Sequence, residues 1–288
     1  MTIARSTFLV FGLFLVVNNA PGYAQSSEMQ KTALTENAKP VRLEVVIFKP
    51  PGKGPFPLVV FNHGSTGQGR DPARFRHTFS DAGIARYFTD RGWLVAFPQR
   101  RGRGKSDGVY DEGLSDVRSL GYECQNAERS LAGVERALTD IDAVVEALRS
   151  RSDVRKESIL IAGQSRGGAL AVAYSGRHPN KVLGVINFVG GWMGSRCINA
   201  SRINWGTFKI GSAYPGESLW LYADNDSFYS LLHSEGNFHM FTVNGGKGKF
   251  VTLEVPSGDG HFLRRWPRLW QPAVEQYLKT LGVHPKPK

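Results

Sequence analysis

Short apolar segments recur along the chain, and their length and composition predict β-strands. They are rich in Val, Ile, Leu and aromatic side chains, which favour strands. These segments are residues 41–48, 58–61, 93–97, 159–162, 183–189, 219–222 and 250–255. Helix-compatible stretches lie between them, at residues 79–90, 127–149, 167–176 and 267–281. Within 127–149, apolar residues recur at steps of three or four positions, which indicates a helix with one buried face.

The alternation of strands and helices predicts the fold class. Strands separated by helices form a mostly parallel, doubly wound sheet with helices on both faces. We therefore expect one α/β domain over residues 40–282. Residues 104–125 and 191–216 are longer than ordinary connections, and such stretches often form short cap or lid insertions near the ligand site.

The two ends of the chain differ from this core. Arg5 precedes the apolar run 8–17, and the small-residue pattern Gly22-Tyr23-Ala24 follows it. This layout predicts a signal peptide over residues 1–24, cleaved after Ala24, and a periplasmic or secreted protein without an integral membrane anchor. The polar residues 25–39 predict a flexible segment, and residues 283–288 a tail.

The net charge of +11 comes from cations scattered along the chain. A soluble basic surface explains them better than affinity for anionic envelope surfaces or acidic ligands. No nucleic-acid module is present. Cys124 and Cys197 would meet an oxidising compartment after export, so a disulfide and two buried thiols are both open. The oligomeric state is unknown.

Residues 163–167 read Gly-Gln-Ser-Arg-Gly, with a strand-like run before them and a run of small residues after them. A nucleophile elbow needs this context, because its serine sits on a strained turn between a strand and a helix. Ser165 is therefore the predicted nucleophile. A second match at residues 104–108 does not lead into a helix, so we reject Ser106 as the nucleophile. Gln99 stands where a phosphate loop would need glycine, so no nucleotide site is expected.

Enzymes with a nucleophile elbow carry their catalytic triad in the chain order serine, acid, histidine. The acid and the histidine are therefore expected after Ser165. His261 follows the last predicted strand through a turn-rich segment, and we expect it to be the base rather than His233, His239 or His284. Asp224 and Asp226 both follow the strand 219–222. We favour Asp226, because the acid must lie past the sheet edge to orient the histidine, and Asp224 is expected in a turn.

An oxyanion site needs two backbone N–H donors. The strand at 58–61 runs into His63-Gly64-Ser65, and we assign the Ser65 amide as one donor, with Gly64 as the alternative. The Arg166 amide is the other. His63 is expected to shape this loop rather than act as a base, because its chain position precedes the serine.

These motifs together resemble the α/β-hydrolase superfamily, in particular its dienelactone-hydrolase-like and prolyl-oligopeptidase-like branches. The resemblance spans about residues 41–282 and rests on the residues around 62–65, 100–108, 163–167, 222–226 and 260–262. It implies an esterase, a lactonase or a peptidase. Dienelactone hydrolases carry a cysteine where this chain has Ser165. Because the sequence shows no propeller before the catalytic region, we do not expect a gated oligopeptidase.

We therefore expect an exported serine hydrolase that cleaves a carboxylic ester or lactone of a small molecule through an acyl-serine intermediate. An exported serine peptidase or amidase is the alternative, and a non-catalytic binding protein on the same fold is a third. The histidine and cysteine spacings match no metal motif, so neither a metal nor a cofactor is expected. Five aromatic residues on the predicted loops are candidates for an apolar substrate pocket or for core positions: Tyr110, Tyr122, Trp192, Trp205 and Phe228.

Overall fold

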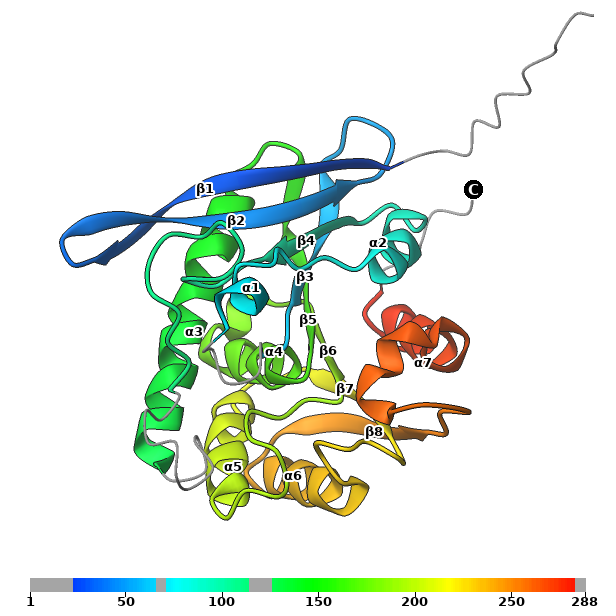
Figure 1. Ribbon diagram of the computed structural model, residues 1–288. Helices are drawn as coiled ribbons and strands as arrows, with labels where there is room; N and C mark the ends of the chain where they lie inside the picture. Colours follow the sequence, from blue (N-terminus) through cyan, green and yellow to red (C-terminus); the bar gives the residue numbers. More distant parts are fainter. Residues whose placement is uncertain (1–22, 66–70, 114–125, 283–288) are drawn as a thin grey trace, which may run out of the picture.

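The computed structural model describes residues 23–65, 71–113 and 126–282. Within these residues eight strands form one sheet in the order β1-β2-β4-β3-β5-β6-β7-β8 (Figure 1). The strands are β1 (Ala24–Glu36), β2 (Lys39–Lys49), β3 (Phe56–Asn62), β4 (Leu94–Pro98), β5 (Val154–Gln164), β6 (Gly184–Phe188), β7 (Glu217–Ala223) and β8 (Lys247–Leu253). β1, β2 and β4 pair antiparallel, and the pairs from β4 through β3 to β8 are parallel.

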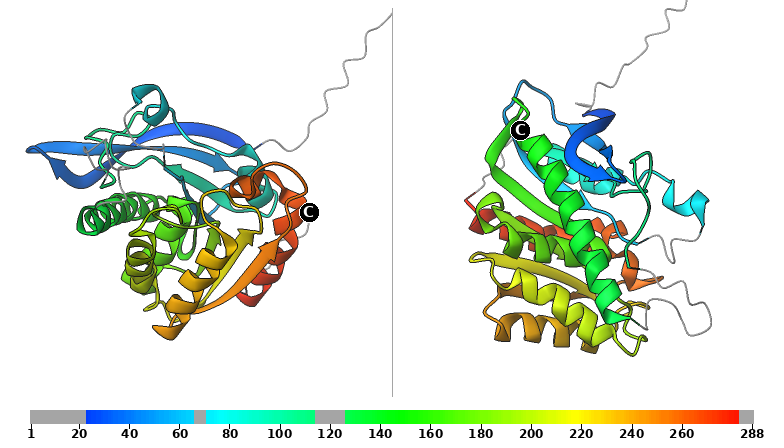
Figure 2. Two further views of the ribbon diagram at one scale, coloured as in Figure 1. Left: turned by 60° about the horizontal axis from the view of Figure 1, so that its bottom comes forward. Right: turned by 90° about the vertical axis from the view of Figure 1, so that its left-hand side faces the viewer.

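Helices cover both faces of the sheet, as predicted (Figures 1 and 2). On one face lie α3 (Ala127–Arg149), α4 (Arg166–Arg177), α5 (Ala200–Gly211) and α6 (Leu231–Val243). On the other lie α2 (Ala82–Thr89) and α7 (Pro267–Thr280). Three short elements complete the described chain: α1 (Pro72–Phe75) and the 3₁₀ turns η3 (Pro179–Lys181) and η4 (Gly260–Arg265).

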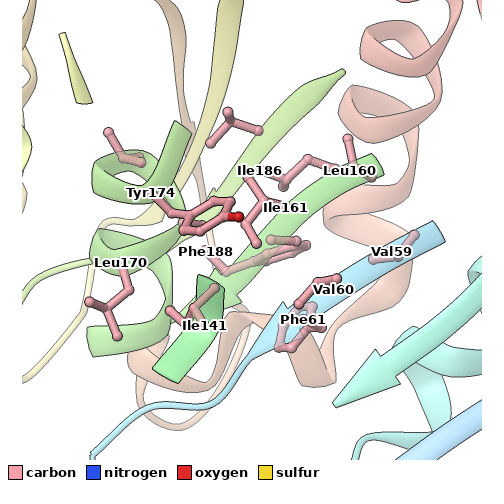
Figure 3. Close-up of a cluster of buried hydrophobic side chains, with 14 of the residues drawn as sticks. Val59, Val60, Phe61, Ile141, Leu160, Ile161, Leu170, Tyr174, Ile186 and Phe188 are labelled. Atoms are coloured by element: carbon pink, nitrogen blue, oxygen red, sulfur yellow. The ribbon is translucent and has the colours of Figure 1, made fainter. Parts of the chain in front are cut away.

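The centre of the core lies where β3, β5 and β6 meet α3 and α4 (Figure 3). The strands are buried on both faces, which explains why they read as continuous apolar runs in the sequence. Val60, Ile161 and Ile186 are fully buried in the strands, and Ile141 and Leu170 are fully buried in the two helices. Burying such side chains contributes about 1.5–3 kcal/mol each. The core therefore fixes the elements from which the central loops emerge.

Each predicted strand and helix overlaps an observed one, but the expectation for residues 25–39 is wrong. Residues 24–36 form β1, which pairs with β2 along the sheet edge. Most of its side chains are exposed or half-buried, so pairing relies on the backbone ladder and leaves little apolar signal. Residues 191–216 also differ from a lid, because they contain α5, which packs against α4 and α6.

The signal peptide is predicted over residues 1–24. Of these, residues 1–22 lie outside the described residues. Cleavage after Ala24 would leave Gln25 as the first residue, one position into β1. Across the described ranges, no helix combines the length and apolarity that crossing a membrane requires.

Candidate active site

Ser165 occupies a strained turn between β5 and α4. Its backbone has φ +59° and ψ −125°, a region that residues other than glycine rarely adopt. Gly163 and Gly167 lie on both sides of Ser165 and allow the neighbouring backbone segments to approach closely. A Cβ on Gly167 would lie 2.0 Å from the Asn62 carbonyl oxygen, and one on Gly163 would lie 2.3 Å from the Gly167 backbone. The sequence thus brings Ser165 to the carboxyl ends of the parallel strands, where ligand sites of such sheets lie.

The structure brings His261 and Asp226 together. His261 Nδ1 lies 3.0 Å from Asp226 Oδ2 and 3.2 Å from Oδ1. Asp226 follows β7 and also accepts the backbone N–H groups of Phe228 at 2.7 Å and Tyr229 at 2.9 Å. The Asp226 side chain is fully buried, whereas Asp224 is exposed. A carboxylate held this way orients the imidazole and favours the tautomer that carries a proton on Nδ1.

The other histidines lie elsewhere. His233 lies on α6, where its Nε2 is 2.8 Å from Asn204 Nδ2. His239 is on the same helix and exposed, and His284 lies outside the described residues.

The loop of His261 is fastened to the elbow by side chains. Asp259 caps η4 by accepting the His261 N–H at 2.9 Å. Gln164, the residue before Ser165, donates from Nε2 to the His261 carbonyl oxygen at 2.6 Å. Arg264 Nε in turn donates to Gln164 Oε1 at 2.9 Å. The two bonds of Gln164 connect segments 97 and 100 positions apart and fix the histidine loop relative to the serine turn.

Tyr229 is a site residue that the sequence patterns did not indicate. Its hydroxyl donates to the Gly191 carbonyl oxygen at 2.5 Å and lies 3.5 Å from Ser165 Oγ. Among the hydrogen bonds of the described residues, none joins Ser165 Oγ to His261. Catalytic hydrogen bonds are often long without substrate and tighten on binding. The signal that points to Tyr229 is its place in the exit loop of Asp226, three positions later.

The loop after β3 lies against the serine. A Cβ on Gly64 would lie 3.1 Å from Ser165 Cβ and 3.6 Å from Ser165 Oγ. Ser65 is the next residue and is exposed, and Arg166 opens α4. His63 is fully buried, with Nδ1 2.7 Å from the Gly64 carbonyl oxygen. Burial, together with the charges of Arg100 and Arg103, lowers the pKa of His63 well below its ordinary value, so its imidazole is neutral.

Comparison with known proteins finds a matching family model and solved structures with the same fold. The family model, described as serine aminopeptidase, S33, matches residues 59–196. No curated protein sequence matches the chain. Solved structures share its fold. An esterase from Pyrococcus furiosus aligns with a TM-score of 0.61 at 12% identity, over 90% of each chain. A putative dienelactone hydrolase from Klebsiella pneumoniae aligns with a TM-score of 0.57 at 15% identity, over 90% of this chain and 99% of that one.

An acylaminoacyl peptidase from Pyrococcus horikoshii is also similar, with a TM-score of 0.60 at 16% identity. The alignment covers 93% of this chain and 43% of the peptidase. These solved structures show that the chain has the α/β-hydrolase fold. The family model adds that residues 59–196 match a family with this fold.

A buried charge cluster lies beside the elbow of this α/β hydrolase, and the sequence patterns did not indicate it. Glu112 accepts from Arg100 Nε at 2.7 Å, from Arg166 Nη1 at 3.1 Å and from the Tyr110 hydroxyl at 3.1 Å. Arg100 also donates to the carbonyl oxygen of His63 at 3.0 Å. Burial alone would raise the pKa of Glu112, but Arg100, Arg166 and Arg103 outweigh it and lower the pKa to about 2. Glu112 thus links the elbow to the loops after β3 and β4.

Ser106 belongs to the structural part of the same loop. Its buried hydroxyl donates to the Gln99 carbonyl oxygen at 2.7 Å and accepts the Glu44 N–H at 2.9 Å. The Glu44 contact joins the loop after β4 to β2, and the Gln99 contact lies within that loop. The Ser106 hydroxyl therefore stabilises the loop.

The remaining candidates differ in their surroundings, and two of them lie outside the described residues. Phe228 is half exposed and packs on His261, with ring centroids 4.4 Å apart. Trp192 is buried, and its ring centroid lies 4.7 Å from the Arg166 guanidinium carbon. Trp205 is exposed on α5. Tyr122 and Cys124 lie outside the described residues, and Cys197 is a buried free thiol. In the described part of the chain no group of His, Cys, Asp and Glu side chains is arranged to hold a metal ion.

A cavity of about 560 Å³ lies away from this site, between β1 and α3. It is lined by residues such as Leu34, Leu138 and Asp142, and no triad residue contributes to it.

The charge cluster leads to a prediction about pH. Because the pKa of Glu112 is about 2 in the folded hydrolase, against an ordinary value of 4.5, its ionised form stabilises the fold above pH 4.5, by roughly 3 kcal/mol. This contribution is lost as the pH falls from 4.5 towards 2. Urea unfolding of the wild type and Glu112→Gln should show a large stability difference at pH 7 that shrinks below pH 4.5. An equal difference at pH 7 and pH 3 contradicts the assignment.

Proposed function

We propose that the protein is a serine hydrolase that cleaves a carboxylic ester or lactone of a small molecule through an acyl-Ser165 intermediate. The observation that supports this most is the buried Asp226–His261 pair on a loop bonded to the strained turn of Ser165. A nucleophile, an imidazole and a carboxylate that orients the imidazole are the three parts that acyl transfer needs.

The proposed reaction starts with proton transfer. His261 accepts the Ser165 hydroxyl proton on Nε2 while Oγ attacks the ester carbonyl carbon, and Asp226 stabilises the imidazolium. The oxyanion receives hydrogen bonds from the backbone amides of Ser65 and Arg166. His261 then protonates the leaving alcohol. In the second half, His261 removes a proton from water, which attacks the acyl carbon and restores Ser165. Loss of one oxyanion donor typically costs about 10²- to 10³-fold in rate.

A peptidase or amidase is the second candidate, because the matching family model is that of serine aminopeptidases. The same residues would then cleave an amide. The putative dienelactone hydrolase and the Pyrococcus furiosus esterase, which resemble the chain in fold, support the choice of a small ester over a peptide.

The first prediction for this function concerns labelling of the nucleophile. A fluorophosphonate probe should label the wild type and should fail to label Ser165→Ala, because the attacking oxygen is gone. Labelling of His261→Ala should slow by at least about 10³-fold, because the serine loses its base. Ser106→Ala is the matched control and should label at the wild-type rate. Labelling of folded Ser165→Ala, or none in the wild type, rejects the mechanism.

The second prediction separates the two candidate functions. Purified wild type should hydrolyse a p-nitrophenyl ester with kcat/KM at least about 10²-fold above that for the p-nitroanilide of the same acyl group. Both substrates should lose activity in Ser165→Ala, which removes contaminating hydrolases as an explanation. If the anilide is cleaved as efficiently as the ester, the peptidase or amidase replaces the esterase.

We also propose that the protein is exported, with cleavage after Ala24. The arrangement of Arg5, the apolar run and the small residues before Gln25 supports this. N-terminal sequencing of the protein expressed with its full sequence in a Gram-negative host should give Gln25 as the first residue, in the periplasmic or medium fraction. A cytoplasmic protein that still begins near Met1 would contradict export.

A further inference from the structure

Exposed apolar side chains gather beside the proposed active site. Six large apolar side chains are exposed within the described residues, and Ile198, Phe228 and Leu232 are three of them. These three belong to two segments that are bonded to each other. The Ser195 N–H donates to the Phe228 carbonyl oxygen at 2.8 Å, and Ser195 Oγ accepts the Ser230 N–H at 3.3 Å. Because Ile198 and Leu232 lie two or three positions from these contacts, the three side chains form one apolar patch.

Two turns and two helices keep the segments of the patch together. The Cys197 N–H donates to the carbonyl oxygen of Gly194, and the Ala200 N–H to that of Cys197, both at 3.0 Å. Because the chain is folded rather than extended here, Ile198 stays beside the segment of Phe228. α5 and α6, which follow the two segments, pack against each other (Figure 1). The segments therefore remain neighbours where the helices begin.

The apolar patch borders the proposed triad. The Phe228 ring packs on His261 with ring centroids 4.4 Å apart, and the Phe228 N–H donates to Asp226 Oδ1 at 2.7 Å. Asp226 and Phe228 belong to the same loop after β7, so the patch begins two positions after the acid. Whatever covers the patch therefore lies beside the base of the proposed reaction.

The side chains of the patch protrude into solvent. Ile198 is 92% exposed and Leu232 is 81% exposed. Residues that line a recess for a small ligand lose much of their surface to their neighbours, and these two have not. Single exposed apolar residues are ordinary on protein surfaces, but a group of them beside a proposed active site marks an interaction surface. A fluid lipid layer can surround protruding side chains, whereas a rigid partner would need hollows that match them.

Exposed arginines accompany the apolar side chains. Arg196 lies two positions before Ile198 and is exposed. Arg265 is exposed on η4, the turn that carries His261, and its guanidinium carbon lies 4.5 Å from the centroid of the Phe262 ring. Apolar side chains mixed with cations are typical of proteins that lie on anionic lipid. The net charge of +11 alone did not favour such a surface, and the apolar side chains next to these arginines change that interpretation.

We infer that the apolar patch, together with Arg196 and Arg265, docks the protein on the surface of a lipid bilayer with anionic headgroups. The patch enters the layer, and the two guanidinium groups face the headgroups. Because Phe228 joins the patch to His261, docking brings the triad to the layer, and the ester that Ser165 attacks is one dissolved in it. This second part rests on the proposed ester hydrolysis, whereas docking itself does not.

The first experiment measures docking without catalysis. Ser165→Ala protein that begins at Gln25 is sedimented with vesicles of phosphatidylcholine and phosphatidylglycerol. Residues 1–24 are left out because the apolar run 8–17 would itself bind lipid. The protein should bind these vesicles at least about tenfold more tightly than vesicles of phosphatidylcholine alone. Adding Ile198→Ser and Leu232→Ser together should weaken binding to the anionic vesicles at least about tenfold, because the apolar surface that enters the layer is lost.

Val243→Ser is the matched control for both experiments. Val243 is also a large exposed apolar residue, at 65%, but it lies at the end of α6 away from Leu232. Its substitution removes apolar surface outside the patch and should leave binding to the anionic vesicles unchanged.

The second experiment compares an ester in the layer with an ester in solution. Rates are measured for p-nitrophenyl palmitate dissolved in the anionic vesicles and for p-nitrophenyl acetate in water, with Ser165 intact. The ratio of the palmitate rate to the acetate rate should fall at least about tenfold in the Ile198→Ser, Leu232→Ser double variant, because fewer molecules reach the layer. Val243→Ser should keep the wild-type ratio.

Several outcomes overturn the inference. Absence of vesicle binding by the Ser165→Ala protein does so independently of any patch variant, and so does equal binding to neutral and anionic vesicles. If the double variant loses acetate and palmitate hydrolysis equally, the patch is a subsite for the substrate. If it instead abolishes a dimer measured by ultracentrifugation and the parent does not bind vesicles, the patch is an interface between copies. If vesicles bind but the fluorophosphonate does not label the wild type, docking stands and the proposed function fails.

Discussion

The close approach of three backbone segments at the elbow is the constraint on which the site depends. β3, β5 and α4 meet where Asn62 pairs with Gly163 and where Gly167 lies against the Asn62 carbonyl oxygen. A methyl group at either glycine would separate the strands from the helix. Because they stay together, Ser165 is forced to positive φ and presented above the sheet. The apolar core beneath holds this geometry, since Val60, Ile161 and Leu170 are fully buried around it.

The second level of organisation is electrostatic. Glu112 connects Arg166 on the elbow to Arg100, and Arg100 holds the loop of His63 and Gly64. One carboxylate thus joins the proposed nucleophile turn and the proposed oxyanion loop. The other side of the site is joined by Gln164, which bonds the His261 loop. The two segments that would supply base and oxyanion donors are therefore both attached to the serine turn, which limits their relative motion.

The sequence predicted the parts of this arrangement whose signals are local. The strand-turn-helix pattern around Ser165 and the exit loops that carry Asp226 and His261 lie within a few residues of the elements that position them. Glu112 has no such signal, because its partner Arg166 is 54 positions away. Tyr229 has only its place in the exit loop of Asp226, because the Gly191 carbonyl oxygen that it contacts is 38 positions away in the sequence. β1 was not predicted for another reason. As an edge strand it exposes most of its side chains, so its polar sequence resembles a flexible segment.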